Sequence, residues 1–432
     1  MSESGSDNST TRRDFFRKSS LAAAGALAGF SIIRNSYGQN ADEIKVGVIG
    51  CGGRGTGAVD NCLNAAPNMK LVAMADLYQD HLDKSYKNLT DPNRDGGALS
   101  GIAVEKDHMF VGFDAYKKLL ATDVDLVILA TPPGFRPVQF EAAINAGKHV
   151  FTEKPVAVDP VGIRRFLAAG KLAKQKGLAV VAGTQRRHEK GYLELMKKVH
   201  DGEIGDILSA RAYWNSGGVW VHPREQGWDD MEYQTRNWYY FCWICGDHIV
   251  EQHVHNMDVV NWALGAHPVK AVANGGRQVR TGKDYGNAWD HFTIDFEYES
   301  GAHMFSMCRH WKDSDRLVAE YLQGTKGSTE TTSGRYILRG DKNWRFRGEA
   351  VNPYVQEHTD LINSIRSGNP LNESENVATA TMTAIMGREA AYTGKEITWD
   401  EIMASNLDLS PKELKWGDLP VRPIPMPGKP RS

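Results

Sequence analysis

The sequence predicts an α/β domain with a doubly wound parallel sheet, followed by an α+β domain with a large, mostly antiparallel open sheet. The first prediction rests on short β-branched runs that alternate with helix-length segments, and on glycines that cluster where the first run ends. The second rests on strand-like runs that dominate after Gly205 and often alternate apolar and polar residues.

Length and composition exclude several classes of protein. A chain of 432 residues is too long for one small domain, because single cores stop growing near about 250–300 residues. Lysine and arginine number 51 and aspartate and glutamate 53, so the net charge of −2 gives no general affinity for nucleic acid, and no nucleic-acid partner is expected. Five cysteines in so long a chain do not form a dense disulfide framework.

The N-terminal residues are similar to a bacterial twin-arginine export signal. Arg12-Arg13 precedes a mildly apolar run from Ser19 to Ile33, and Ser36-Tyr37-Gly38 supplies small residues for cleavage. The apolar run is shorter than the about 20 residues that a membrane span needs. We therefore expect export through the twin-arginine translocase to the periplasm or beyond, with no stable membrane insertion afterwards. Because this route carries folded proteins, a cofactor would be bound before export.

A glycine-rich turn follows the first expected strand. The run Ile44–Ile49 leads into Gly50-Cys51-Gly52-Gly53-Arg54-Gly55, a G-x-G-x-x-G pattern. Gly50 permits the tight turn, Gly52 lets the backbone approach a pyrophosphate, and Gly55 lets the next helix pack close to the sheet. The N–H groups at the start of that helix, near Gly53 and Arg54, would face the phosphates. The pattern predicts a dinucleotide-binding Rossmann domain; a glycine-rich turn without a ligand is the alternative.

An acidic residue ends the second expected strand. The run Lys70–Ala75 is followed by Asp76, about 20 residues after the glycine turn, where a carboxylate can bind both ribose hydroxyls. The same charge would repel the 2′-phosphate of NADP. The predicted cofactor is therefore NAD rather than NADP.

Two further segments follow expected strands. Thr131-Pro132-Pro133 comes after the run Asp125–Ala130, and Glu153-Lys154-Pro155 comes after the run His149–Thr152. Ligands of doubly wound sheets bind beyond the carboxyl ends of the strands. Both segments are therefore predicted to lie beside the bound cofactor.

Four signals, in this order, resemble one known family. They are the glycine turn at 50–55, Thr131-Pro132-Pro133, the run Ala146–Val150 that leads into Glu153-Lys154-Pro155, and the run Gly246–Asp258. On these residues the chain is identified as a member of the Gfo/Idh/MocA superfamily, named after glucose–fructose oxidoreductase, inositol dehydrogenase and rhizopine catabolism. The resemblance covers nearly all of residues 43–405. It implies an open sheet whose outer face forms a homodimer or homotetramer.

The resemblance also implies the catalytic residues. Lys154 would lie beside the nicotinamide and the substrate hydroxyl, and Glu251 and His255 would complete the site. Their spacing of four places a carboxylate beside an imidazole on one helix face, where a proton can be transferred. Many members have Asp in place of Glu251 and His in place of Arg136, which leaves the anion preference of the site open. A solvated lysine and simple pairing within a helix are the alternatives.

Neighbouring histidines and cysteines suggest other chemistry. His248, Glu251 and His255 share a helix face that would also suit a divalent metal, but the family site works without one and no fourth ligand is visible, so no metal is predicted. His253 points away from this face and is expected to be structural. Cys242-Trp243-Ile244-Cys245 is a possible redox pair, but it lacks a thioredoxin-like context and is expected to pack in the interior.

The second domain holds the candidate substrate contacts. Residues 213–243 combine many tryptophans and tyrosines with histidine and arginine, which suits a polyhydroxylated ring, although each aromatic residue could instead belong to the core. Expected strands cover 207–214, 269–274, 289–298, 302–309, 318–324 and 336–338. The substrate candidates are Arg136, Arg187, Tyr192, Trp214, His222, Arg224 and Trp238.

These observations divide the chain into four segments. We expect the export signal over 1–40, the NAD-binding domain over 41–175, the substrate-binding and oligomerisation domain over 176–418, and a proline-rich arm over 419–432.

The leading predicted function is an NAD-dependent oxidoreductase that acts on a hydroxyl of a carbohydrate or cyclitol. His255 or Lys154 would take the hydroxyl proton while hydride passes to NAD, and Glu251 would orient the pair. A second class is a glycoside hydrolase or lyase whose tightly bound NAD oxidises the sugar transiently, allows elimination and is regenerated. A third, a sugar-binding module with an inert cofactor, leaves the acid–base residues without a role. Because no soluble nicotinamide pool is expected outside the cytoplasm, export favours a cofactor that stays bound.

Overall fold

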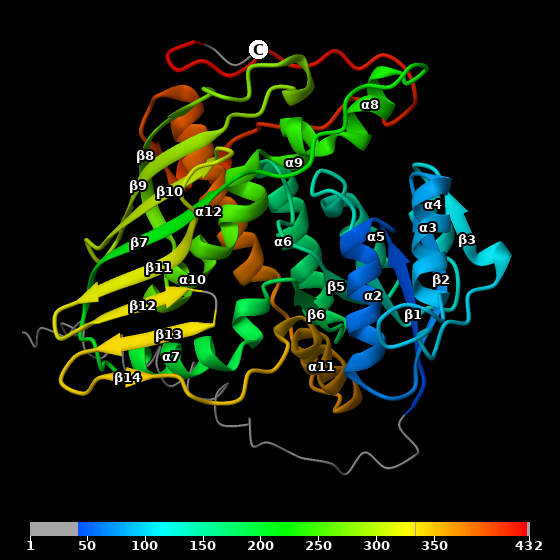
Figure 1. Cartoon of the computed structure of the whole chain (residues 1–432), viewed down its shortest axis with the longest axis horizontal. Helices are drawn as coiled ribbons and strands as arrows, with labels where there is room; N and C mark the ends of the chain where they lie inside the picture. Colours follow the sequence, from blue (N-terminus) through cyan, green and yellow to red (C-terminus); the bar gives the residue numbers. More distant parts are fainter. Residues whose placement is uncertain (1–41, 333, 430–432) are drawn as a thin grey trace, which may run out of the picture. The chain divides into compact units, whose positions relative to one another are not determined.

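A computed structural model describes residues 42–332 and 334–429, so the predicted export signal over 1–40 lies outside the described residues. The first sheet has six parallel strands in the order β3-β2-β1-β4-β5-β6 (Figure 1). These strands are β1 (Ile44–Ile49), β2 (Met69–Asp76), β3 (Met109–Val111), β4 (Leu126–Leu129), β5 (His149–Thr152) and β6 (Val180–Ala182). The strand order reverses between β1 and β4, where doubly wound sheets bind their ligands. The predicted Rossmann sheet is confirmed.

Helices cover both faces of this sheet, which explains why its strands read as continuous apolar runs. All four residues of β4 are buried, as expected for a strand with helices on both sides. The helices between the strands are α2 (Gly53–Ala65), α3 (Gln79–Thr90), α4 (Ala115–Leu120), α5 (Arg136–Asn145) and α6 (Pro160–Gln175). A late helix, α11 (Pro353–Arg366), also packs against α2. Residues far apart in the sequence therefore build the surroundings of the glycine turn.

The second sheet has nine strands in the order β14-β13-β12-β11-β7-β10-β9-β8-β15. Neighbouring strands are antiparallel except β7 and β10, which confirms the predicted mostly antiparallel sheet. The strands are β7 (Ile207–Ser216), β8 (Pro268–Gly276), β9 (His291–Tyr298), β10 (His303–His310), β11 (Leu317–Gly324), β12 (Ser328–Thr332), β13 (Arg335–Arg339), β14 (Trp344–Arg345) and β15 (Ile397–Thr398).

Helices cover one face of the second sheet. In β9 every second residue is buried, the pattern of a sheet with one covered face. The long helix α12 (Ser374–Thr393) packs against β8, β9 and α6, and almost all of its residues are buried. The remaining helices are α7 (Lys190–His200), α8 (Asp230–Arg236), α9 (Cys242–Cys245), a π-helical turn (Ile249–His253), α10 (Val254–Leu264) and α13 (Trp399–Ala404). None of the described helices has both the length and the apolarity to cross a membrane.

The described C-terminal residues after α13 form an extended arm that returns to α8 (Figure 1). The backbone N–H of Gly417 donates to Asp229 Oδ2 at 2.7 Å, and that of Leu419 donates to Asp230 Oδ2 at 3.2 Å. The predicted domain boundaries stay predictions, and β6 lies beyond the boundary expected at residue 175.

Candidate active site

A cavity of about 530 Å³ lies at the carboxyl ends of the parallel strands and extends to Glu251 and Gln252 of the π-helical turn and to His255 of α10. Its size is typical of small-molecule sites. The sequence-predicted residues that line it are Gly50, Gly52, Gly53, Arg54, Asp76, Thr131, Pro132, Arg136, Glu153, Lys154, Trp214, Trp238, Glu251 and His255. The fold therefore brings the predicted cofactor and catalytic residues to one cavity.

The glycine turn fits a pyrophosphate because it needs glycine at two points and leaves space at two others. Gly50 has a φ of 97°, and a Cβ there would lie 2.5 Å from the backbone nitrogen of Thr131. A Cβ on Gly55 would lie 1.8 Å from the carbonyl oxygen of Gly50. Beside Gly52 and Gly53 no atom lies within 4 Å of the added Cβ, so the start of α2 is open to the cavity.

Asp76 is held rigidly at the end of β2. Its Oδ2 accepts a hydrogen bond from the backbone N–H of Cys51 at 2.6 Å, and its Oδ1 accepts one from Tyr78 at 2.9 Å. His81 Nδ1 lies 3.3 Å from Oδ1, and its hydrogen bond with Asp76 raises the pKa of His81. The carboxylate thus joins the glycine turn to the next loop and lies where ribose hydroxyls are expected.

The charge of Glu153 is paired by a residue of the glycine turn. Arg54 Nε donates to Glu153 Oε1, and the Arg54 guanidinium lies 4.9 Å from the centre of the Tyr354 ring. Gly183 packs directly on this carboxylate, since a Cβ there would lie 2.6 Å from Glu153 Oε2. The peptide bond between Lys154 and Pro155 is cis.

Lys154 and Glu251 form an ion pair inside the cavity. Lys154 Nζ donates to the backbone oxygen of Glu251 at 2.7 Å and to its Oε1 at 3.3 Å. The hydroxyl of Tyr239 donates to the other carboxylate oxygen, Oε2, at 3.1 Å. Burial, with the nearby charge of Glu251, raises the pKa of Tyr239 well above its usual range, so this hydroxyl keeps its proton.

His255 lies against Trp214, with ring centres 6.0 Å apart and planes 21° from parallel. It is 9% exposed. Burial, followed by the positive charges of Lys154 and Arg186, lowers the pKa of His255 well below its usual range. The imidazole is therefore neutral near pH 7, and its unprotonated ring nitrogen can accept a hydrogen bond from a substrate hydroxyl.

A π-helical turn, rather than a regular helix, brings Glu251 and His255 to the cavity. Glu251 and Gln252 lie in the π-helical turn, and His255 follows in α10. The wider turn lets two consecutive residues, Glu251 and Gln252, both line the cavity. Glu251 and His255 do face one cavity, as their spacing of four predicts, but Glu251 lies in a π-helical turn and not in a regular helix.

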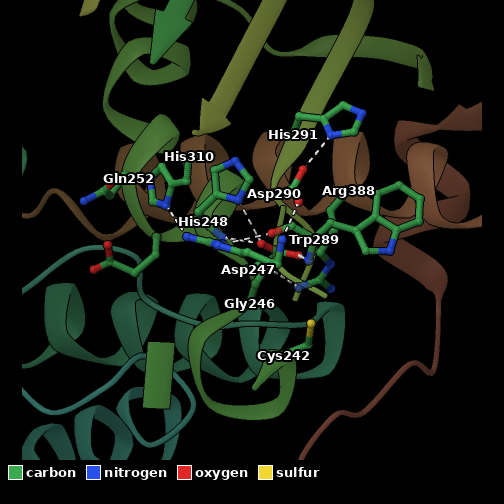
Figure 2. Close-up of polar contacts among 12 residues, drawn as sticks. Cys242, Gly246, Asp247, His248, Gln252, Trp289, Asp290, His291, His310 and Arg388 are labelled. Atoms are coloured by element: carbon green, nitrogen blue, oxygen red, sulfur yellow. Dashed lines mark hydrogen bonds and ion pairs between the residues drawn. The ribbon is translucent and has the colours of Figure 1, made fainter. Parts of the chain in front are cut away.

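A buried polar cluster fixes the start of the π-helical turn (Figure 2). Asp247 has a φ of 71° and accepts hydrogen bonds from the backbone N–H groups of His248 and Trp289, both at 2.6 Å. The ring of His248 also bonds to Asp247. Among residues 42–332 and 334–429 no group of three or more metal-ligating side chains is present, so His248 does not join Glu251 and His255 in a metal site.

His253 and the cysteine motif are structural. His253 is fully buried and its Nε2 lies 2.7 Å from Ser306 Oγ, as its predicted structural role requires. Cys242 and Cys245 are buried, and Cys242 Sγ lies 3.2 Å from the hydroxyl oxygen of Tyr392. Burial raises the pKa of the Cys245 thiol well above its usual range, which makes it a poor nucleophile.

Arg136 is a buried cation in the cavity wall. It is 4% exposed, and its guanidinium donates to the backbone oxygen of Pro155. Its Nε has no hydrogen-bond partner among the described residues. Burial lowers the pKa of Arg136 to about 10, although Glu153 and Glu251 oppose this effect. The side chain remains charged near pH 7 beside the reacting groups.

The other substrate candidates lie in three places: the cavity, the protein interior and the surface. Trp214 and Trp238 line the cavity together with Trp220, whose ring centre lies 5.8 Å from that of Trp238. Four substrate candidates do not line the cavity: Arg187, Tyr192, His222 and Arg224. Two cofactor candidates, Gly55 and Pro133, are buried and do not line it either.

Most of these outlying candidates form hydrogen bonds or ion pairs with other residues of the same chain. Arg187 forms a bidentate ion pair with Asp258, and the Tyr192 hydroxyl donates to Glu320 Oε2 at 2.9 Å. Arg224 donates to Asp230 and to the backbone oxygen of Trp228. The ring of His222 lies on Trp220, at the surface.

Several residues that line the cavity were not predicted. They are Gln139, Gln185, Gln252, Thr235, Trp220 and Tyr354, among others. Gln139 accepts a hydrogen bond from Thr131 Oγ1 at 2.5 Å. Gln252 follows Glu251 directly, so that motif could have indicated it, but a regular helical period turns it away. Tyr354 comes from α11 and has no local signal near the other site residues.

Comparison with known proteins assigns the class defined by this fold and site. Residues 44–184 match the model of an oxidoreductase family with an NAD-binding Rossmann fold, and residues 192–330 match the GFO/IDH/MocA C-terminal domain. These matches place the protein in an oxidoreductase family whose members have an NAD-binding Rossmann domain. The chain belongs to the Gfo/Idh/MocA family, since the two matches together span well over half of it.

Named relatives include proteins that act on different substrates. An inositol 2-dehydrogenase from Klebsiella pneumoniae is 29% identical over 222 residues, which cover 51% of this chain and 55% of that protein. A 2,7-anhydro-N-acetylneuraminate hydratase from Escherichia coli is 26% identical over 258 residues, which cover 58% of this chain and 62% of that protein. The matches thus span little more than half the length of these relatives.

A solved structure shares the fold. The aldose-aldose oxidoreductase from Caulobacter crescentus, complexed with glycerol, is 18% identical and has a TM-score of 0.65. The match covers 83% of this chain and 100% of that one. At this identity the likeness concerns the fold alone.

Proposed function

We propose that this protein is an NAD-dependent oxidoreductase that acts on a hydroxyl of a carbohydrate or cyclitol. The observation that carries the proposal is the convergence of Lys154, Glu251 and His255 in one cavity with the glycine turn. The inositol 2-dehydrogenase relative supports a polyhydroxylated substrate. Trp214, Trp220 and Trp238 supply aromatic surfaces for such a ring.

Lys154, His255 and Glu251 have different tasks in the proton transfer. An ammonium group has three N–H donors, and Lys154 gives two of them to Glu251, so the third is available to the substrate hydroxyl oxygen. The neutral imidazole of His255 takes the hydroxyl proton. Bound NAD supplies the acceptor for the hydride that leaves the carbon. Glu251 holds the Lys154 ammonium in position through these two contacts, and Arg136 adds a second positive charge in the wall.

The NAD-binding groups favour NAD over NADP in this proposal. The backbone of Gly52 and Gly53 is open to the pyrophosphate, and Asp76 is oriented by two backbone N–H groups toward the ribose position. The carboxylate of Asp76, which is 8% exposed, would repel a 2′-phosphate bound at this position.

We also propose export by the twin-arginine pathway, because Arg12-Arg13 precedes an apolar run, and we propose that the exported protein retains its cofactor.

Contacts of the C-terminal arm support retention of the cofactor. The ring of Trp416 lies 4.9 Å from that of Phe113 and 5.7 Å from that of Tyr78, and both of these residues line the cavity near Asp76. The Tyr78 hydroxyl also bonds to Thr235 Oγ1 of α8 at 2.5 Å. The arm and α8 thus cover the adenosine end.

A second function is favoured by retention and by the hydratase relative. In this alternative the protein is a glycoside hydrolase or lyase whose tightly bound NAD is regenerated within each turnover, so net redox is zero. One experiment separates the two: purified protein is incubated with a glycoside panel and no added NAD. Stoichiometric NADH supports the oxidoreductase, released aglycone supports the hydrolase or lyase, and neither product contradicts both.

We further propose that the protein forms a homodimer or homotetramer through the outer face of the second sheet. Val272 of β8 and Phe305 of β10 are large, exposed apolar residues, and both lie in one cross-strand row because each pairs with Asp295 on β9. Light scattering after size-exclusion chromatography gives the mass directly. A monomer at micromolar concentration would contradict the proposal.

A further inference from the structure

Gln252 lines the cavity beside Glu251 but has no part in the proton transfer described above. Its Oε1 lies 2.7 Å from His310 Nε2. Its side-chain nitrogen has no hydrogen-bond partner among the described residues, and it points away from the polar cluster in Figure 2. A glutamine amide has a donor end and an acceptor end. The bond to His310 therefore decides which end meets a substrate.

The polarity of that bond is set by a buried arginine. Arg280 Nη2 lies 2.5 Å from His310 Nδ1. A guanidinium can only donate, so Nδ1 accepts and a neutral imidazole must carry its proton on Nε2. Burial, followed by neighbouring His248 and Arg280, lowers the pKa of His310 well below its usual range, so the ring is neutral. Nε2–H therefore donates to Gln252 Oε1, and the amide N–H groups face the cavity.

The surrounding contacts hold this chain of donors in place. Arg280 is 3% exposed, and its Nη1 donates to the backbone oxygen of Trp289 at 2.9 Å. The backbone N–H of Arg280 donates to Asp290 Oδ2 at 2.9 Å. The His310 ring stacks on Tyr239, whose hydroxyl donates to Glu251. The buried contacts of Arg280, His310 and Tyr239 thus orient both Glu251 and Gln252 in the cavity.

We propose that Gln252 is a substrate-binding residue that donates a hydrogen bond to an acceptor oxygen of the substrate, on the same ring as the reacting hydroxyl. His310 and Arg280 are positioning residues that keep the amide in its donor orientation. A hydroxyl, carbonyl or carboxylate oxygen can accept this bond, whereas a protonated amine at the same position meets a second donor and is rejected. The inference rests on the proposed function for the class of substrate.

The first test measures the tautomer of His310 without any turnover. NAD-loaded protein with nitrogen-labelled histidine is examined by proton–nitrogen correlation spectra, and the His310 signals are assigned by their loss in His310→Asn. We expect a neutral ring protonated at Nε2 alone. A neutral ring protonated at Nδ1 and not at Nε2 near pH 7 would overturn the orientation of Gln252, because Nε2 would then accept a hydrogen bond from the amide.

The second test measures binding of a panel of cyclitols and aldoses to the NAD-loaded protein by calorimetry. Gln252→Glu replaces the donor by an acceptor of the same size, and Gln252→Met removes the donor without adding a charge. Both should weaken the best ligand about 10- to 100-fold, because a polar group of the ligand is left unpaired. Gln175→Glu, exposed at the end of α6, is the matched control. Unchanged affinity in both Gln252 variants would overturn the proposal.

Kinetics then separate positioning from a merely structural effect. His310→Phe cannot donate to Gln252, so it should raise KM about as much as Gln252→Met does while leaving kcat within about threefold. A fall in kcat with unchanged KM would contradict the role of His310. If ligands bind but none is oxidised, the proposed function fails and the Gln252 inference survives. If no panel member binds the wild type, both fail.

Discussion

Replacing Lys154 by methionine removes the ammonium group and nearly preserves the length of the side chain. Two of its three donors go to Glu251, at 2.7 Å and 3.3 Å, so the variant loses the one donor that meets the substrate. General acid–base residues contribute about 10²–10⁴-fold, and we expect kcat to fall by that factor. NAD affinity should change less than about threefold, because backbone groups of the glycine turn hold the pyrophosphate.

The same substitution should lower stability for an electrostatic reason. The side chains of Lys154 and Glu251 are 12% and 13% exposed, so the variant leaves a largely buried carboxylate without its cation. Breaking a fully buried pair costs about 3–5 kcal/mol, and we expect about 1–3 kcal/mol here after allowing for solvent screening. The double variant Lys154→Met/Glu251→Gln should regain most of this loss and remain inactive.

Steady-state kinetics, fluorescence titration of NAD and urea unfolding measure these three effects. Lys148→Met, which lies outside the cavity, is the control for loss of a lysine. Wild-type turnover in a folded Lys154→Met variant would refute the reasoning and return Lys154 to a structural role. A double variant no more stable than the single one would refute the electrostatic explanation.

Three further predictions concern the cofactor and pH. Asp76→Ser should erode the preference for NAD over NADP about tenfold in fluorescence titrations, and wild-type protein that binds NADP as tightly as NAD would contradict the role of Asp76. Trp416→Ala should speed the loss of NAD during dialysis about 2- to 10-fold, and an unchanged rate would remove the arm from cofactor retention. Burial lowers the pKa of His358 to about 3, so the unfolded chain binds a proton that the folded chain lacks between that value and about 6.5. Stability should therefore fall on acidification below about pH 6.5, by about 1.4 kcal/mol per pH unit from this group. His358→Leu should reduce the pH slope of the unfolding free energy by that amount in urea unfolding, and an unchanged slope would contradict the prediction.

The cofactor side of the site was predictable because its signals are local. The glycine turn and the Glu153-Lys154-Pro155 segment each follow directly on an apolar strand, and Asp76 is the last residue of another. Parallel strands bring their carboxyl ends to one edge, so sequence position is enough to place these residues together. The two sheets were predictable because their signals are local as well: continuous apolar runs for the parallel sheet, and alternating apolar and polar residues for the antiparallel sheet.

The substrate side was less predictable because it depends on tertiary packing. Arg187 and Tyr192 have the right chemistry, but Asp258 and Glu320 bind them in the interior. Gln252 reaches the cavity only through the π-helical turn, which Asp247 and its buried partners hold in place. Tyr354 comes from a helix far along the chain. No periodicity or spacing reports such contacts.

A single-turnover absorbance measurement tests the central claim most directly. Protein purified with its NAD is mixed with each member of the cyclitol and aldose panel, without added cofactor, and the absorbance of reduced nicotinamide is followed. We expect at least one polyol to produce bound NADH, in an amount equal to the cofactor present, and we expect Lys154→Met to slow its formation about 10²–10⁴-fold. NAD-loaded wild-type protein that reduces no cofactor with any polyol or glycoside would contradict the account.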